Sequence, residues 1–250
     1  YGLDANLSSY FNDGGEDGFI SLFERAVLNG HRPEDVVLLE IDPYHQKTLP
    51  DFLLTQKRLG IRIADIAQVE KRGRKLYHDG KPIERIYNRV VFDELVKRKY
   101  PAGFHFSDEL DVEWAGHPNW FFRLSKFSLP WFQHPSVPHT RFLSDFTSWP
   151  DQLENYVLKP LFSFAGSGVR IGPTRQELDA IPEKERGNYV LQERIDFVPV
   201  IDTPAGTTKL EVRITYILQG ELIPVATIIR TGRSQMMGVD FNRDLEWVGA

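Results

Sequence analysis

The sequence predicts a mixed fold, with an α/β first half on a parallel sheet and an α+β, mostly antiparallel second half. In the first half, apolar strand-like runs alternate with helical patterns, as in a parallel sheet with crossover helices. Later in the chain, short strand candidates are separated by glycine-containing turns. We therefore expect two domains, residues 1–118 and 119–250.

The first half contains alternating helices and strands. Phe19–Leu28 has apolar residues at helical spacing and is followed by Gly30, so it predicts a helix. Asp35–Ile41 is apolar between polar ends, which is typical of a strand buried on both faces. The other predicted elements are the helix Leu49–Leu59, the strand 61–66, a hairpin around Asp79-Gly80, the strand Arg85–Val91 and the helix Phe92–Lys99.

The second half predicts fewer helices. Its helical patterns are Asn119–Leu129 and Thr174–Ala180. Its strand candidates are Tyr156–Pro160, Tyr189–Ile195, Leu210–Leu218 and Leu222–Ile229.

Composition narrows the functional classes. The 250 residues carry a formal net charge of −5 and include no cysteine, so disulfides, thiol catalysis and cysteine zinc sites are excluded. This charge gives no global argument for a nucleic-acid partner, and no apolar run approaches the length of a membrane span. We expect a cytoplasmic protein without nucleic-acid or membrane partners. We also expect the chain, which begins at Tyr1, to be part of a longer protein.

The strongest local signal is a strand that ends in Lys159 and continues into a loop of small residues. Such a loop lets backbone N–H groups approach an anion, while the lysine supplies a fixed charge, as in polyphosphate sites. A hairpin with turn glycines and a solvated lysine explains the same pattern equally well.

Three further polar groups stand at predicted strand ends. The pair Gln192-Glu193 ends a strand whose backbone could meet an adenine edge, and Glu193 could take ribose hydroxyls. Glu211 and Arg213 share one strand face, and Arg230 ends the next strand. The functional interpretation is a carboxylate near a metal and a guanidinium directed at a phosphate or a carboxylate. Solvated charges and a cross-face ion pair are the alternative interpretations.

At the N-terminus, Asp4 and Asn6 are hard oxygen ligands two residues apart, suited to Mg²⁺. A polar strand end is the simpler interpretation of this pair alone. Asp240 and Asn242 repeat the same spacing near the other end of the chain and compete as a metal pair.

In this order, these signals resemble an ATP-grasp nucleotide-binding domain preceded by a small pre-ATP-grasp α/β domain. The resemblance rests on Val157-Leu158-Lys159-Pro160 with its glycine-rich loop, the hinge strand Leu191–Ile195, Glu211-x-Arg213 and Arg230. It implies that Lys126 and Lys159 contact nucleotide phosphates and that Arg213 and Arg230 serve catalysis. The remaining ATP contacts that it implies are Ser163, Ala165, Gly166, Ser167, Gly168, Gln192, Glu193, Arg194 and Ile195.

The position of Asp4-x-Asn6 before the small domain resembles the circularly permuted branch of this family, which includes eukaryotic glutathione synthetase and the ATP-grasp half of glutathionylspermidine synthetase. That resemblance implies Mg²⁺ ligands at Asp4, Asn6 and Glu211, with the strand 1–7 contributing to the active site. It also implies substrate contacts at Ser8, Ser9 and Arg89.

The resemblance implies an ADP-forming carboxylate–amine ligase that uses ATP and Mg²⁺ and acts through an acylphosphate on small-molecule substrates. Two alternatives remain: a nucleotide-binding module without catalysis, and a phosphotransferase acting on a hydroxyl.

Overall fold

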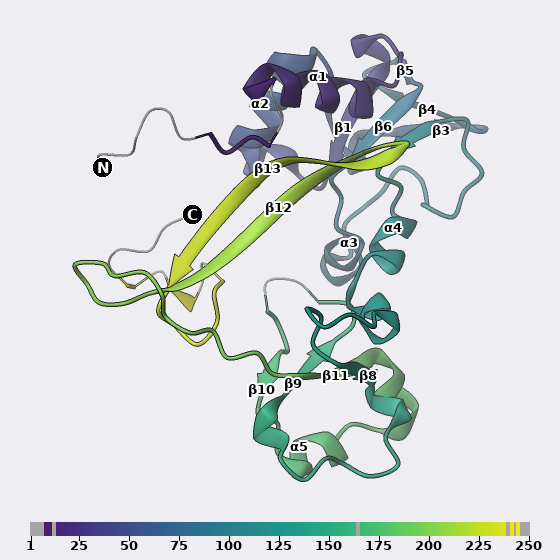
Figure 1. The fold of residues 1–250 in the computed structure, drawn as a ribbon. Coiled ribbons are helices and arrows are strands. Elements are labelled where there is room, and N and C mark those ends of the chain that lie inside the picture. The colour runs from purple at the N-terminus through teal and green to yellow at the C-terminus, as the bar shows by residue number, and fades with distance from the viewer. Residues whose placement is uncertain (1–7, 12–13, 164–165, 239–240, 243, 246–250) are drawn as a thin grey trace. The chain divides into compact units, whose positions relative to one another are not determined.

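The computed structural model describes residues 8–11, 14–163, 166–238, 241–242 and 244–245 (Figure 1). The chain divides into two compact units. The first contains residues 1–118 and 212–228, and the second contains residues 119–211 and 229–250. Residues 212–228, which sequence reasoning places in the second domain, thus group with the first unit.

A four-stranded parallel sheet forms the centre of the first unit. Its strand order is β2-β1-β6-β7, with β1 paired to β2 and β6, and β6 paired to β7. The strands are β1 (Val36–Glu40), β2 (Arg62–Asp65), β6 (Arg85–Asn88) and β7 (Glu113–Ala115). The helices of this unit are α1 (Gly15–Leu28), α2 (Leu49–Leu59) and α3 (Phe92–Arg98). The parallel sheet confirms the α/β prediction for this half.

Both faces of β1 are buried, which explains its continuous apolar sequence. Val37 and Leu39 belong to one apolar cluster, whereas Val36 and Leu38 belong to a second that includes Phe52 of α2. Successive side chains of a strand point to opposite faces. The sheet therefore separates the two clusters.

A three-stranded antiparallel sheet follows β2. It consists of β3 (Glu70–Arg72), β4 (Lys75–His78) and β5 (Lys81–Ile83). Asp79 and Gly80 both have positive φ, at 52° and 70°, as a two-residue turn with a primed geometry requires. The predicted hairpin is confirmed.

The second unit contains a four-stranded antiparallel sheet in the order β10-β9-β11-β8. Its strands are β8 (Thr140–Phe142), β9 (Tyr156–Pro160), β10 (Arg170–Ile171) and β11 (Tyr189–Glu193). The helix α5 (Arg175–Asp179) begins at a capping box between Thr174 and Glu177. Leu178 of α5 packs with Leu158 and Leu191 on one face of the sheet.

The predicted helix Asn119–Leu129 is wrong in extent. The structure has a short helix, α4 (Asn119–Arg123), followed by the 3-10 helix η4 (Lys126–Trp131). Ser125 separates them because its backbone is extended and its side chain accepts a hydrogen bond from Phe127 N. A serine that caps a new turn in this way ends the preceding helix. The other 3-10 helices are η1 (Pro33–Asp35), η2 (Pro43–His45), η3 (Ile66–Gln68), η5 (Leu143–Asp145), η6 (Leu153–Asn155) and η7 (Glu183–Asn188).

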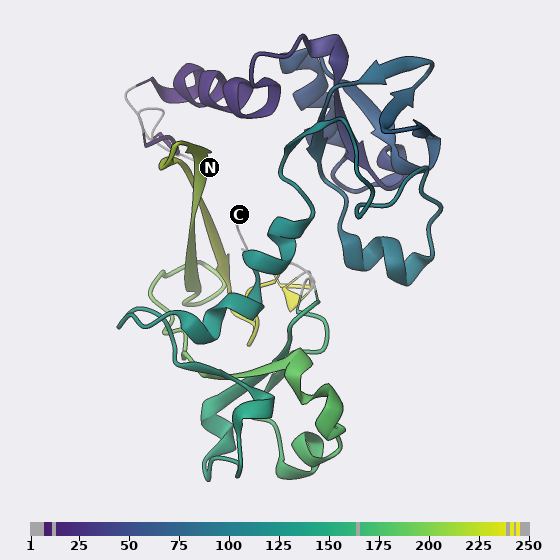
Figure 2. The ribbon, with the colours of Figure 1, turned by 90° about the vertical axis from the view of Figure 1, so that its right-hand side faces the viewer.

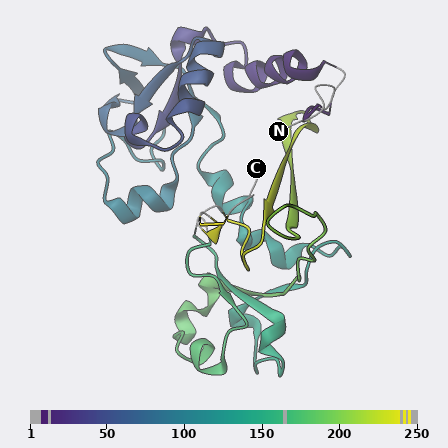
Figure 3. The same ribbon diagram turned by 90° about the vertical axis from the view of Figure 1, so that its left-hand side faces the viewer.

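The strands β12 (Lys209–Gln219) and β13 (Glu221–Gly232) form a long two-stranded ribbon that turns at Gly220 (Figures 2 and 3). Near the N-terminus, Tyr10 forms an antiparallel bridge with Ala226. Ser9 O accepts a hydrogen bond from Thr227 N, and Phe11 N donates one to Val225 O. The N-terminal segment therefore pairs with β13. Among the described residues, no helix combines the length and apolar character needed to cross a membrane.

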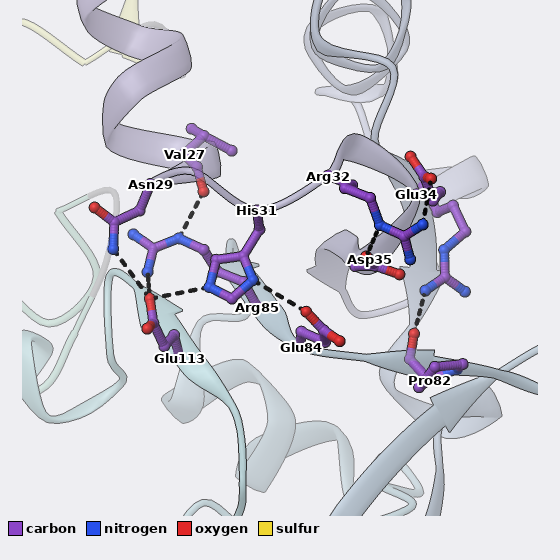
Figure 4. A network of polar contacts seen from close by, with 11 residues as sticks. Val27, Asn29, His31, Arg32, Glu34, Asp35, Pro82, Glu84, Arg85 and Glu113 are labelled. Carbon is purple, nitrogen blue, oxygen red and sulfur yellow. Dashed lines mark hydrogen bonds and ion pairs between the residues drawn. The ribbon is translucent and has the colours of Figure 1, made fainter.

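A polar network connects α1 to the sheet of the first unit (Figure 4). Arg85 is 7% exposed and donates to the carbonyl oxygens of Ala26 and Val27 at the end of α1. It also forms an ion pair of 2.7 Å with Glu113 of β7. Arg85 therefore satisfies helix carbonyls that have no partner within the helix.

We predict that Arg85→Ala lowers the free energy of unfolding of the first unit by about 3 kcal/mol, because one buried and one half-buried carbonyl group lose a charged donor. Urea unfolding followed by circular dichroism measures this change. The control is Arg74→Ala, which removes an exposed arginine paired with Glu109 and Asp111 and is expected to have little effect. Equal effects of the two substitutions would contradict the role of Arg85.

Candidate functional site

Lys126 contacts the beginning of the small-residue loop of the second unit. It is the first residue of η4, and its Nζ donates to Ser163 O at 3.0 Å and to Ser163 Oγ at 2.6 Å. Ser163 Oγ also donates a hydrogen bond of 3.4 Å to Pro160 O. Pro160 follows Lys159 directly in β9. Lys126 and Ser163, two of the predicted ATP contacts, are thus brought together. They lie beside the end of β9, the strand that carries Lys159, a third predicted contact.

Lys159 lies on one face of the sheet within a short polar chain. Its Nζ donates to Gln192 Oε1, and Gln192 Nε2 donates to Thr140 Oγ1 at 2.8 Å. Burial lowers the pKa of Lys159 from its ordinary value. Within the described part of the chain, no carboxylate forms an ion pair with this ammonium group. A half-buried cation paired only with neutral oxygen atoms is well suited to receive an anion.

The described part of the glycine-rich loop needs its glycines. Gly166 and Gly168 have positive φ, at 77° and 73°, a region that side-chain-bearing residues rarely adopt. A Cβ on Gly168 would lie 2.7 Å from Pro160 Cγ. Ser167 between them is exposed. The predicted contact Ala165 lies outside the described residues.

The hinge residues are divided between the two faces of the sheet. In the antiparallel register, Val190 is opposite Lys159, whereas Glu193 is opposite Tyr156. Because directly paired residues share a face and successive residues alternate, Gln192 lies on the face of Lys159 and Glu193 on the opposite face. The N–H groups of Glu193 and Arg194 donate to His139 O and Asn155 O, respectively. The next hinge residue, Ile195, is exposed.

The face of the sheet that carries Glu193 borders two cavities. A cavity of about 630 Å³ is lined by Glu193, Arg194 and Tyr156 among others, and an adjacent cavity of about 450 Å³ shares Tyr156 and reaches Arg141 and Trp149. Two predicted ATP contacts, Glu193 and Arg194, therefore face a groove that does not contain Lys159. The sequence spacing predicted the strands that carry Lys159 and Glu193, but it did not indicate that the two side chains lie on opposite faces of the sheet.

Glu211 and Arg230 meet across the base of the β12–β13 ribbon. Glu211 Oε1 lies 3.8 Å from Arg230 Nη1, and the two side chains are about one-fifth exposed, at 23% and 20%. Arg230 Nε is buried and has no hydrogen-bond partner among the described residues. Arg213 lies two residues beyond Glu211 and is exposed. The predicted carboxylate and one predicted guanidinium are thus close to each other.

The predicted metal site is described only in part. Asp4 and Asn6 lie outside the described residues, so Glu211 is the one predicted ligand that has a position. Among the described residues, no group of three histidine, aspartate or glutamate side chains is arranged to hold a metal ion. Of the predicted substrate contacts, Ser8 bonds to the backbone of Tyr10, and Ser9 uses its backbone carbonyl to pair with β13.

In the first unit, Arg89 lies where the strands of the parallel sheet end. It forms a 2.7 Å ion pair with Asp51, and its guanidinium lies over the ring of Phe52, 5.3 Å from the centroid. Neighbouring Asn88 has a buried Oδ1 without a partner among the described residues. The carboxyl ends of parallel strands are the usual position of ligands in such sheets.

Sequence reasoning missed Glu40 at this same edge of the sheet. Glu40 ends β1 and is 8% exposed, and its Oε1 accepts a hydrogen bond from Ile41 N. Burial raises the pKa of Glu40 to about 7, although the bond from Ile41 and the charge of Arg89 oppose this shift. The sequence signal at this position was a single carboxylate at the end of a strand of four apolar residues. A strand end exposed to solvent gives the same pattern.

The structure was compared with known proteins. Its fold is similar to that of a glutathione synthetase-like effector from Globodera pallida in its apo form, with a TM-score of 0.51 and 12% sequence identity. The match covers 86% of this chain and 59% of that chain, so this chain spans well under two thirds of its neighbour's length. No protein-family model and no curated protein sequence matches. At this identity the likeness concerns the fold alone.

We predict that Glu40→Gln stabilises the first unit at pH 8 by up to about 3 kcal/mol and has little effect at pH 4. A carboxyl group whose folded pKa is raised from 4.5 to about 7 destabilises the native state increasingly as pH rises through that interval. Glutamine removes this ionisation and retains an acceptor for Ile41 N. Urea unfolding at both pH values measures the difference, with the exposed Glu24→Gln as a control. An equal gain at both pH values would contradict the assignment.

Proposed function

We propose that the second unit binds ATP and that the chain is part of an ADP-forming carboxylate–amine ligase. The observation that carries the proposal is the pair of lysines beside one small-residue loop. Lys126 is anchored on Ser163, and Lys159 is half-buried without a carboxylate partner among the described residues. Two fixed cations and flexible backbone N–H groups suit a polyphosphate. The fold likeness to a glutathione synthetase-like protein supports the same proposal.

In this proposal, Lys126 and Lys159 neutralise phosphate charge, while Gly166, Ser167 and Gly168 donate backbone hydrogen bonds. Phosphoryl transfer depends mainly on such positioning and charge neutralisation. Arg213 and Arg230 would orient the transferred phosphoryl group and the substrate carboxylate. The buried Nε of Arg230, which lacks a partner among the described residues, supports a ligand at this position.

The proposed reaction has two steps. A substrate carboxylate oxygen attacks the γ-phosphorus, and the bond to the β-phosphate oxygen breaks to release ADP and leave an acylphosphate. The amine then attacks the acyl carbon, and the carbon–oxygen bond to phosphate breaks to release inorganic phosphate and form the amide. A closed glycine-rich loop would keep water from the acylphosphate.

We retain Mg²⁺ in the proposal with Asp4, Asn6 and Glu211 as its ligands. Arg89 and Glu40 are proposed to face the small-molecule substrate, because they lie at the carboxyl edge of the parallel sheet. Bound Mg²⁺ would neutralise charge on the phosphate oxygens.

We predict that Lys159→Ala weakens Mg-ATP binding roughly 10- to 100-fold, because one charge-assisted phosphate contact is lost. Isothermal titration calorimetry measures the affinity, and the exposed Lys184→Ala is the matched control. Near-native affinity in Lys159→Ala would show that the phosphate site lies elsewhere.

The pH dependence gives a second measure of the same residue. Because burial lowers the pKa of Lys159, ATP affinity should decline with rising pH before an ordinary lysine would lose its proton. Lys159→Arg keeps the charge throughout and should remove this component of the decline. Identical pH profiles for the two proteins would contradict a direct contact.

Hydroxylamine trapping tests the reaction class. The protein is incubated with Mg-ATP, hydroxylamine and a panel of amino acids and short peptides, and we expect an acyl hydroxamate in equal amount to ADP. A phosphorylated hydroxyl compound without hydroxamate would favour a phosphotransferase, and binding without ADP release would favour a non-catalytic module.

The same assay tests the proposed metal ligand. We predict that Asp4→Asn abolishes Mg²⁺-dependent ADP release without lowering the melting temperature, since a hard anionic ligand is lost. Full activity in this variant would exclude Asp4 as a ligand.

A further inference from the structure

One buried amide side chain organises the segment that follows β13 in the second unit. Asn242 is 3% exposed. Its Oδ1 accepts hydrogen bonds from Arg233 N at 3.2 Å and Ser234 N at 3.1 Å. Its Nδ2 donates to Met236 O at 2.8 Å and Gly238 O at 2.9 Å. All four hydrogen-bonding positions of the amide are therefore used within a single loop.

This arrangement distinguishes between the two competing interpretations of Asn242. A metal ligand needs a free lone pair on Oδ1, but both lone pairs already accept backbone N–H groups. Coordination of a cation would break these bonds within a buried site, which is costly. Gly232 fits the same arrangement, since a Cβ there would lie 2.7 Å from Asn242 Oδ1. Asn242 therefore has a structural role in this conformation.

The loop that Asn242 organises packs against the glycine-rich loop. A Cβ on Gly166 would lie 2.6 Å from Met236 Cε and 3.4 Å from Phe241 Cε2. Met236 carries one of the carbonyl groups bound by Asn242, and Phe241 is its neighbour in sequence. The amide thus bonds the backbone of Met236 directly, and both it and Phe241 N bond to Gly238 O.

We propose that Asn242 is a positioning residue that holds Met236 and Phe241 against Gly166 and so restricts the conformations of the glycine-rich loop. The consequence for nucleotide affinity rests on the proposed function, whereas the coupling between the two loops does not. By this account, a substitution at Asn242 alters a loop that is distant in sequence and that Asn242 itself does not bind.

Hydrogen exchange measured by NMR without nucleotide tests the coupling. In Asn242→Ala, the Arg233 and Ser234 amides lose their acceptor. We expect their exchange, and that of the Val169 amide, which donates to Gly166 O, to accelerate about 10-fold. The amides of β9 and β11 should not change. The matched control, Asn188→Ala, replaces an exposed asparagine of the same unit. An unchanged Val169 amide beside faster Arg233 and Ser234 amides would overturn the proposal.

A pair of substitutions tests the contact even if Asn242→Ala unfolds the second unit. Gly166→Ala should accelerate Val169 exchange, because its methyl group meets Met236 and its φ is positive. Adding Met236→Ala should restore part of the protection by removing the clash. No restoration in the double variant would overturn the proposal.

Mg-ATP affinity then separates the two proposals. We expect the affinity of Asn242→Ala, measured well below its melting temperature, to fall about 10-fold, since loop preorganisation is lost. If the exchange results hold but the native protein does not bind Mg-ATP, the proposed function fails and the coupling stands. If native binding depends on Lys159 while Asn242→Ala alters neither Val169 exchange nor affinity, the coupling fails and the function stands.

Discussion

The sheet of the second unit holds a charged lysine on one face, and partial burial of that charge costs free energy. Lys159 is held by Gln192, which is held in turn by Thr140, so three strands contribute to one polar chain. Neutral oxygen atoms only partly compensate this half-buried ammonium group, as its lowered pKa indicates. An arriving phosphate would complete the compensation.

The glycine-rich loop beside this lysine is restrained at both of its described ends. Lys126 binds Ser163, where the loop begins, and Met236 and Phe241 approach Gly166. Gly168 is restricted further by Pro160. If the loop binds phosphate groups, as we propose, such restraint favours binding, because fewer conformations are lost.

In the first unit, charge is used in two ways. Arg85 is fully engaged by helix carbonyls and Glu113 and therefore serves stability. At the carboxyl edge of the same sheet, Glu40 is buried, and Asn88 retains an oxygen atom without a partner among the described residues. Such incompletely compensated groups are typical of ligand sites. The two ends of one sheet thus differ in how completely their polar groups are paired.

The sequence by itself determined the elements whose signals are local. The buried strand β1, the helix α2 ending before Gly60 and the Asp79-Gly80 hairpin follow from apolar runs, glycine and turn chemistry over a few residues. Lys159 and its glycine loop were also visible, because strand and loop are adjacent in the chain.

Only the tertiary structure decided what depends on pairing between distant segments. The register of β9 and β11 places Glu193 and Lys159 on opposite faces of the sheet. The sequence did not distinguish them, because each residue lies near the end of an apolar strand. The break at Ser125 depends on one side-chain hydrogen bond, and the role of Asn242 depends on four. The sequence shows which polar residues are available. Their burial, and the number of hydrogen bonds that each of them already makes, decide which can still bind a ligand.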